Sequence, residues 1–270
     1  MSLIEKALAL RKLQSAAPAE RVGRVVPVNL GALRSAGLLP PEQEEPLISR
    51  QFQHIKRPLI ASALGRGAPR LPNGRLIMVA SALPGEGKTF TALNLALSMS
   101  IEKDTRVVLV DADVAKPHIS RLLGLEGTAG LLDVLRGSQP GLESVALHTD
   151  IPNLSVIPAG IGSADRAELL SSARMEQIVR SLGQRDEQRI VLFDSPPLLH
   201  TTESHALIRV SGQVVVVVRA ETTPQHVLAD ALSYLKEHAA VSLVLNESTR
   251  SGNSDHYYSG YGDSRSEPAA

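Results

Sequence analysis

The sequence contains no cysteine and has no surplus of charge of either sign. The lack of cysteine excludes thiolate metal sites and cysteine-bound iron–sulfur clusters. Lysine and arginine together number 28, as do aspartate and glutamate, so the composition gives no reason to expect nucleic acid as the main partner. The longest apolar run, Val214 to Val218, is far below the ~18 residues that a membrane-spanning helix needs. We therefore expect a soluble protein of the cytoplasm.

The first 47 residues divide into a short amphipathic segment and a linker. In residues 1–15, Ser2 and Glu5 have the spacing of a helix capping box, and apolar residues recur at helical intervals up to Leu10. Acidic and basic residues lie among them, so the segment does not resemble a signal peptide. It predicts a helix that is either a fraying terminus or a docking element. Residues 16–47 are rich in proline and glycine, as expected of a linker.

Residues 48–246 are predicted to form one α/β domain. A helix is expected from Ile48 to Leu64, with a break near Pro58. Beyond Gly74, short runs that are apolar throughout alternate with helical patterns, which is typical of a mostly parallel central sheet flanked by helices on both faces. The expected strands are Leu76–Ala80, Val107–Val110, Leu154–Ile157, Ile190–Phe193, Val214–Val218 and Val241–Leu245. The expected helices between them are Phe90–Ser100, Leu131–Leu135, Arg166–Leu182, Ser204–Val210 and Gln225–His238.

The strongest local signal is ALPGEGKT, from Ala82 to Thr89, between an expected strand and an expected helix. Gly85 and Gly87 allow the backbone to turn successive N–H groups toward phosphate oxygens. Lys88 can reach the β- and γ-phosphates, and the Thr89 hydroxyl can coordinate Mg²⁺. Ala82 stands where the general pattern has its first glycine. The loop predicts a P-loop NTPase with ATP and Mg²⁺ as cofactors. The residues expected to contact the nucleotide are Pro84, Gly85, Glu86, Gly87, Lys88, Thr89, Phe90 and Asn246.

Three aspartates follow two other expected strands. Asp111 and Asp113 lie in VVLVDAD, and Asp194 lies in IVLFDSPP. Because parallel strands end at the same edge of a sheet, these carboxylates should lie beside the P-loop, where ligands bind in open α/β sheets. Three acids there would repel one another without a cation, and Mg²⁺ bound by Thr89, a carboxylate, water and phosphate oxygens would meet that need. For Asp113 the alternative is a structural helix N-cap.

Three segments together resemble the three Walker motifs of bacterial tyrosine kinases: in chain order, ALPGEGKT, VVLVDADVAKP and IVLFDSPP. These kinases are P-loop ATPases related to MinD and ParA, and they accompany exopolysaccharide synthesis and export. The resemblance covers residues 74–246, and SLIEKAL and HIKRPL are similar to a subgroup linked to exosortase-type clusters. It implies that Lys88, Asp111, Asp113 and Asp194 are catalytic. Thr89, Asp113 and Asp194 would hold the metal, and Asp111 would accept the proton of the attacking tyrosine.

Residues 247–270 form a polar tail that is predicted to be disordered. Tyr257, Tyr258 and Tyr261, three of the four tyrosines in the chain, lie in this tail. The resemblance implies that the protein is a tyrosine autokinase that phosphorylates them. It also implies a homo-oligomer, a cognate phosphatase, and a transmembrane polysaccharide co-polymerase that activates the kinase and holds it at the inner membrane.

Two elements depart from the pattern of that family. Ala115 stands where the second motif usually has arginine, and Arg50, Gln53 and Lys56 stand where the family has the E-x-x-R-x-x-R element that builds a ring of subunits. Two other functions therefore stay open. One is a regulatory ATPase of the MinD/ParA type, and the other is a nucleotide-gated scaffold without kinase activity.

Overall fold

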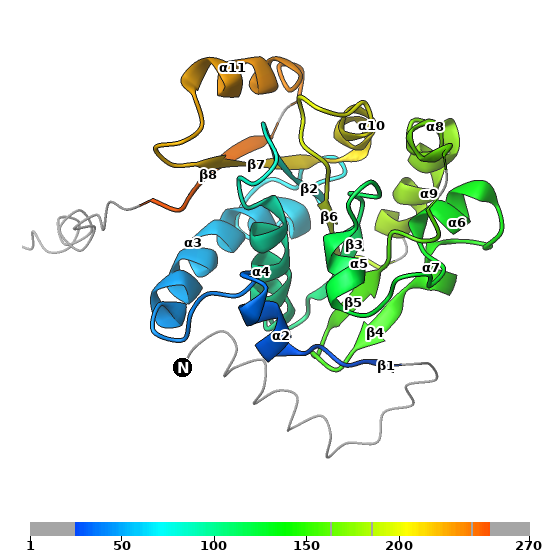
Figure 1. Cartoon of the computed structure of the whole chain (residues 1–270), viewed down its shortest axis with the longest axis horizontal. Helices are drawn as coiled ribbons and strands as arrows, with labels where there is room; N and C mark the ends of the chain where they lie inside the picture. The colour runs from blue at the N-terminus through cyan, green and yellow to red at the C-terminus, as the bar shows by residue number, and fades with distance from the viewer. Residues whose placement is uncertain (1–24, 163, 185, 239, 249–270) are drawn as a thin grey trace, which may run out of the picture.

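The computed structural model describes residues 25–248 except residues 163, 185 and 239 (Figure 1). The predicted helix in residues 1–15 and the tail tyrosines Tyr257, Tyr258 and Tyr261 lie outside the described residues. The described part is built on one sheet of eight strands in the order β1-β4-β5-β3-β6-β2-β7-β8. Only β4 and β5 pair antiparallel within it, so the predicted mostly parallel sheet is confirmed.

All six predicted strands are present, and their ends lie within one residue of the predicted ends. They are β2 (Leu76–Ser81), β3 (Arg106–Asp111), β5 (Leu154–Ile157), β6 (Arg189–Asp194), β7 (Gln213–Arg219) and β8 (Val241–Asn246). Two short strands at one side of the sheet, β1 (Val25–Val26) and β4 (Leu147–Thr149), were not predicted. With two and three residues, they are too short to show a periodic pattern.

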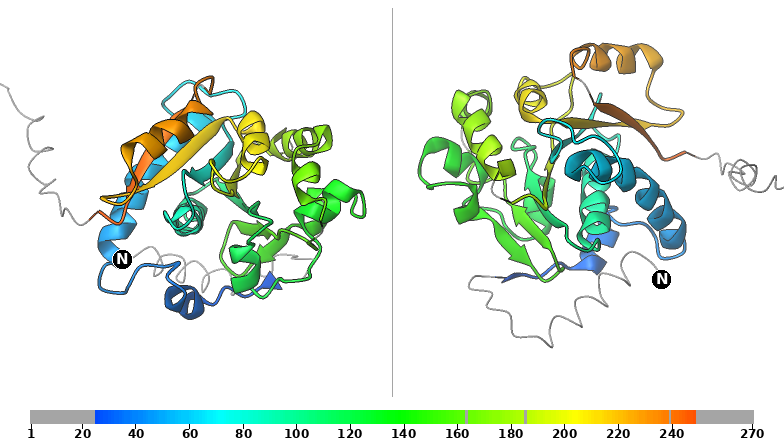
Figure 2. Two further views of the ribbon diagram at one scale, coloured as in Figure 1. Left: turned by 45° about the horizontal axis from the view of Figure 1, so that its top comes forward. Right: turned by 180° about the vertical axis from the view of Figure 1, so that it is seen from behind.

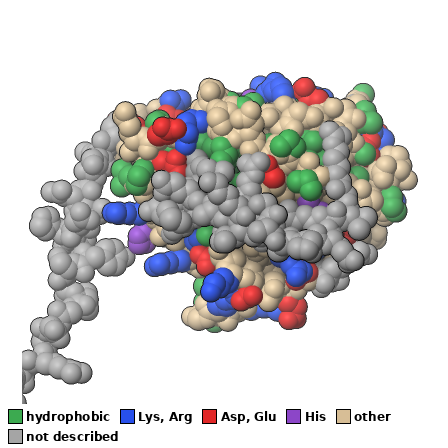
Figure 3. All heavy atoms as spheres, turned by 90° about the horizontal axis from the view of Figure 1, so that it is seen from below, with side chains coloured by type: hydrophobic (Ala, Val, Ile, Leu, Met, Phe, Trp, Pro, Cys, Tyr) green, Lys and Arg blue, Asp and Glu red, His purple; other side chains and the backbone are tan. Residues whose placement is uncertain are grey.

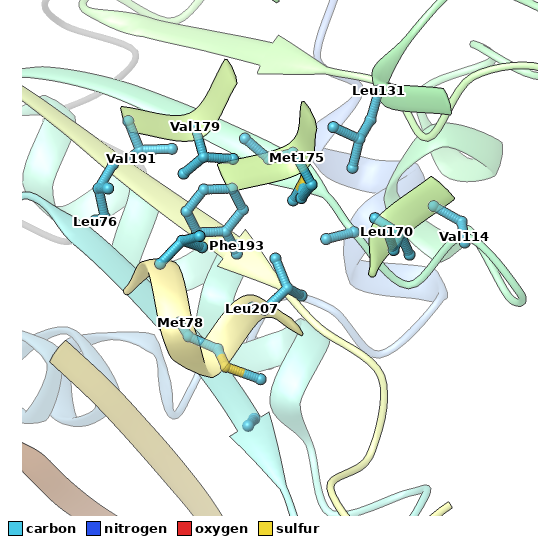
Figure 4. Close-up of a cluster of buried hydrophobic side chains, with 14 of the residues drawn as sticks. Leu76, Met78, Val114, Leu131, Leu170, Met175, Val179, Val191, Phe193 and Leu207 are labelled. Carbon is cyan, nitrogen blue, oxygen red and sulfur yellow. The ribbon is translucent and has the colours of Figure 1, made fainter. Parts of the chain in front are cut away.

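Helices cover both faces of the sheet, as predicted (Figures 1 and 2). They are α2 (Leu30–Ser35), α3 (Glu45–Leu64), α4 (Lys88–Ser100), α5 (His118–Leu122), α6 (Leu131–Arg136), α7 (Leu142–Val145), α8 (Arg166–Leu170), α9 (Ala173–Gln184), α10 (Glu203–Val210) and α11 (Gln225–Ser233). One core lies between the sheet and α3 and α4. The other lies between the sheet and helices that include α6, α9, α10 and α11, and in it Phe193 packs near Val179 and Leu207 (Figure 4). Burial of both faces explains why β2, β3, β6 and β7 are apolar throughout, whereas Val241, Leu243 and Leu245 of the edge strand β8 are exposed.

Three helix predictions were wrong in their limits. α3 continues through Pro58 without a break, because the helix is held by the packing of Phe52 and Leu59 in the core. The single helix expected over residues 166–182 is two helices, and the Ser172 side chain both donates to Leu169 O and accepts from Met175 N at the interruption. α11 ends at Ser233, earlier than predicted.

Part of the predicted linker, residues 16–47, is folded. Residues 25–44 contain β1 and α2, and the side chains of Val26, Leu33 and Leu39 are buried in the core. The Asn94 side chain of α4 donates to Leu38 O at 2.8 Å, which ties this segment to the helix that follows the P-loop. The segment is therefore an integral part of the domain.

Candidate active site

The loop between β2 and α4 has the backbone that the glycines predict. Gly85 and Gly87 have φ angles of 83° and 95°, in the left-handed region that favours glycine. At Gly87 a side chain would also displace the Asn246 amide, because a Cβ atom there would lie 2.0 Å from Asn246 Nδ2. Helix α4 begins at Lys88, so its N-terminus faces the position that the curled loop leaves for an anion.

Glu86 supports the loop from within. Its buried carboxylate accepts from Leu83 N at 2.8 Å and from the hydroxyl of Thr223, while Asn246 Nδ2 donates to Glu86 O at 3.1 Å. These bonds join the P-loop to the ends of β7 and β8. The Glu86 side chain is thus used for structure, and only its main chain is left to contact a nucleotide. Thr223, which lies in no motif, was missed by sequence reasoning.

The three aspartates meet at the edge of the sheet beside the loop. Asp111 and Asp194 are register partners on the neighbouring strands β3 and β6, and β6 pairs with β2. Lys88 Nζ lies 3.0 Å from Asp113 Oδ2, with only 11% and 8% of the two side chains exposed. Asp113 thus forms an ion pair with Lys88 here, a contact that neither a metal ligand nor a helix N-cap requires. The predicted closeness of the acids to the P-loop is present.

Burial perturbs two of these carboxylates. Asp111 Oδ2 accepts from both N and Oγ of Ser120 at 2.7 Å, whereas Oδ1 is buried and has no donor within the described part of the chain. Burial raises the pKa of Asp111 to about 6 despite those bonds. Neither Asp194 oxygen accepts a hydrogen bond of good geometry from a described residue, and burial raises its pKa to about 8, although the charge of Lys88 and a marginal contact with the Thr89 hydroxyl oppose the shift.

This donor set fits a hard cation. Asp111 and Asp194 together have three buried carboxylate oxygens without donors, the Thr89 hydroxyl lies near Asp194, and Mg²⁺ prefers oxygen ligands of this kind. Within the described ranges, no three His, Asp or Glu side chains are grouped so as to hold a metal ion by themselves. Magnesium usually retains water and substrate phosphate oxygens, so a cation bound together with a nucleotide suits the site better than a resident metal.

A cavity of about 1270 Å³ lies beside the loop. Its walls come from residues 36–44, from α3, from α5 and from the end of β8. Of the residues predicted to contact nucleotide, Gly85, Gly87, Lys88, Thr89, Phe90 and Asn246 line it. Pro84 and Glu86 do not. His118 and Arg121 of α5 also line the cavity, and sequence reasoning did not identify them.

A family model described as AAA domain, AAA_31, matches residues 74–245. The chain belongs to this AAA domain family. The match runs from β2 into β8 and therefore includes the loop and the three aspartates, whereas the cavity walls formed by residues 36–44 and α3 lie outside it. The mostly parallel sheet and the loop geometry agree with a P-loop NTPase fold.

Curated relatives and a solved structure give the likeness more detail. The chain is 33% identical to the tyrosine-protein kinase Ptk of Acinetobacter johnsonii over 179 residues, which are 65% of this chain and 24% of the relative. It is 27% identical to the tyrosine-protein kinase YwqD of Bacillus subtilis, over 87% of this chain and 96% of that one. The crystal structure of the VpsO kinase domain superposes with a TM-score of 0.62 at 27% identity, covering 76% of this chain and 98% of the other. The chain spans about a quarter of the length of the first curated relatives, 24% and 22%.

Proposed function

We propose that the chain is an ATP-dependent protein-tyrosine autokinase that transfers the γ-phosphoryl group to tyrosines in its own C-terminal tail. The observation that carries this proposal is the ion pair of Lys88, at the start of α4, with Asp113, beside the buried carboxylates of Asp111 and Asp194 on the neighbouring ends of β3 and β6. Phosphoryl transfer needs positioning and charge neutralisation more than covalent catalysis, and the site offers both. The likeness to proteins named tyrosine-protein kinases supports the same activity.

In this proposal each site residue has a separate task. The loop backbone and Lys88 hold the phosphates, and Lys88 exchanges its ion pair with Asp113 for the γ-phosphate. Thr89, Asp113 and Asp194 would hold Mg²⁺, which when bound neutralises charge on the transferred group. Asp111 accepts the tyrosine proton, since its Oδ1 has no donor among the described residues and a pKa of about 6 leaves it largely ionised at neutral pH.

The tail is the proposed substrate because of where it begins. Asn246, Glu247 and Ser248 line the cavity, so the chain leaves the described domain at the site itself. The eleven residues from Asn246 to Tyr257 span at most ~36–40 Å, which is enough to reach this site or that of a neighbouring copy. Tyr234, the one tyrosine among the described residues, follows α11 and is 51% exposed, with its ring against that of His205.

We further propose that the chain acts in exopolysaccharide synthesis and export, as a homo-oligomer activated by a transmembrane co-polymerase. No helix in the described residues is long and apolar enough to cross a membrane. Lys56, at one position of the ring element, is buried in the domain, where Nζ donates to Ser98 O at 2.6 Å and pairs with Glu102 at 2.7 Å. Because Lys56 stabilises the packing of α3 on α4, assembly of copies would depend more on a partner. Residues 1–15 are the proposed docking element, and a cognate phosphatase would reverse the modification.

The equal numbers of basic and acidic residues, 28 each, give no reason to propose a nucleic-acid partner. On the face shown in Figure 3, basic and acidic side chains are interspersed and form no large area of one sign among the described residues.

The test of the proposed function is phosphotyrosine on the purified chain after incubation with Mg-ATP. ATP hydrolysis without phosphotyrosine would favour a regulatory ATPase, and neither reaction would favour a nucleotide-gated scaffold.

A further inference from the structure

The basic side chains that line the cavity differ in their partners. Lys88 is paired with Asp113, and Arg34 donates to Glu42 and Glu45 at 2.8 Å. His118 and Arg121 also line the cavity, but neither makes an ion pair with a described residue. Two basic side chains at the rim are therefore available to an incoming anion.

Helix α5 holds these two side chains in a fixed relation to Asp111. Ile119 and Ser120 point inward and are buried, with 2% and 3% exposure. Ser120 donates twice to Asp111 and also accepts from Ala159 N at 3.0 Å through Oγ. His118 and Arg121 are exposed and lie three residues apart, which places them on one face of the helix turn. A ligand bound to that face would be positioned relative to the proposed general base.

Basic side chains outnumber acidic ones around His118, where Arg121, Lys88 and Lys116 are near and Asp113 is the acidic neighbour. The pKa of His118 is lowered, first by burial and then by repulsion from Arg121 and Lys88, while Asp113 opposes the shift. The neutral imidazole is then a hydrogen-bond donor beside a permanently charged guanidinium. The nucleotide phosphates already have the loop N–H groups and Lys88 as partners, so the anion suited to α5 is a second one.

The tail sequence supplies such an anion two positions from two of its three tyrosines. Asp255 lies two residues before Tyr257, and Asp263 lies two residues after Tyr261. In an extended peptide, side chains two residues apart point to the same side. A peptide that presents its phenol to the γ-phosphate therefore presents a carboxylate toward the same surface of the enzyme.

We propose that His118 and Arg121 form a docking subsite for the carboxylate of an acidic tyrosine peptide, with Asp255 and Asp263 of the tail as its ligands. The inference rests on the proposed function, since it defines the substrate class of that site. Arg121 attracts and pairs with the carboxylate, and His118 donates a hydrogen bond to it. The subsite selects tyrosines that have an acidic residue two positions away.

The test is equilibrium binding, which requires no phosphoryl transfer. A fluorescent peptide of residues 251–263 is titrated with the full chain in Mg-ADP, and anisotropy is measured. The chain carries Asp255→Asn and Asp263→Asn, so that its own tail does not compete. Arg121→Glu should raise the Kd about tenfold, because repulsion replaces attraction between charges. A peptide with Asp255→Lys and Asp263→Lys should reverse the preference and bind better to Arg121→Glu.

Arg70→Glu is the matched control. Arg70 is exposed, precedes the start of β2 and does not line the cavity, so the same change of charge there should leave the Kd unaltered. Equal peptide affinity of Arg121→Glu and its parent would overturn the proposal. The proposal would also be overturned if Arg121→Glu lost as much affinity for Mg-ADP as for the peptide, because Arg121 would then bind the nucleotide phosphates. Phosphotyrosine formation by the unaltered chain is scored separately, so failure of the kinase assignment is distinguishable from failure of the subsite.

Discussion

Replacing Asp194 by asparagine should stabilise the metal-free protein while removing its response to magnesium. Asp194 is fully buried between β3 and β2, and neither of its oxygens has a donor in the described part of the chain. Without a cation, burial favours the neutral form of the carboxyl, and its pKa rises from 3.8 to about 8. An amide of the same shape carries no charge to desolvate.

The size of the effect follows from the shift. At pH 7 the unfolded chain is ionised and the folded carboxyl is mostly protonated, which corresponds to about 4 kcal/mol against folding at ~1.36 kcal/mol per pKa unit. The buried amide of the variant would itself lack partners, at a cost of roughly 1–3 kcal/mol. The expected net gain of the Asp194→Asn variant is therefore about 1–3 kcal/mol. Between about pH 4 and 8 the folded parent keeps this proton whereas its unfolded chain does not, so the metal-free stability of the parent falls as pH rises. The variant has no titrating group at this position and lacks this pH dependence.

Urea unfolding at several pH values, with chelator or with Mg-ADP, measures both parts of this prediction. Mg-ADP should stabilise the parent strongly and the Asp194→Asn variant weakly. Asp133→Asn is the matched control. The Asp133 carboxylate accepts from Gly130 N at 2.9 Å and from Ile161 N at 3.0 Å, so the same change there should destabilise the folded protein. A variant at Asp194 that is less stable than its parent in chelator would refute the reasoning.

Two further predictions concern the loop and the N-terminal segment. Gly87→Ala should weaken nucleotide binding more than Gly85→Ala, because both have left-handed backbone but only a Cβ at Gly87 meets Asn246; equal Kd values by calorimetry would contradict this. Deleting residues 1–15 should abolish activation by the cytoplasmic segment of the co-polymerase while basal autophosphorylation is kept, and a full response of the deleted chain would refute docking there. A longer truncation, to Pro46, would also remove buried Leu33 and Leu39 and so is expected to impair folding.

The sequence predicted the central sheet well because the physical cause of the pattern is local. Strands such as β7, with five consecutive valines, are covered on both faces and so are apolar throughout. Residues 25–44 were predicted as linker because their prolines and glycines break any periodicity. Their folding depends on contacts distant in sequence, such as Val28 N with Asp150 Oδ1, 122 residues away. The continuity of α3 through Pro58 likewise depends on tertiary packing.

The site shows the same division between local and distant causes. The P-loop and the three aspartates follow directly from motifs at strand ends, and the structure brings them together as predicted. The bond between Glu86 and Thr223 joins residues 137 positions apart, which no local pattern indicates. His118 and Arg121 lie in a five-residue helix whose placement depends on Ser120 and Asp111, so their position at the cavity required the structure.

The central claim is tested most directly by mapping phosphate on the full chain after incubation with Mg-ATP. Mass spectrometry should find phosphotyrosine at Tyr257, Tyr258 or Tyr261 in the parent and none in Lys88→Met, with thermal unfolding used to verify that the variant is folded. Changing the three tail tyrosines to phenylalanine should remove the modification without altering ATP affinity. Phosphate mainly on Tyr234, or unchanged phosphotyrosine in Lys88→Met, would contradict a tail autokinase that acts through this P-loop.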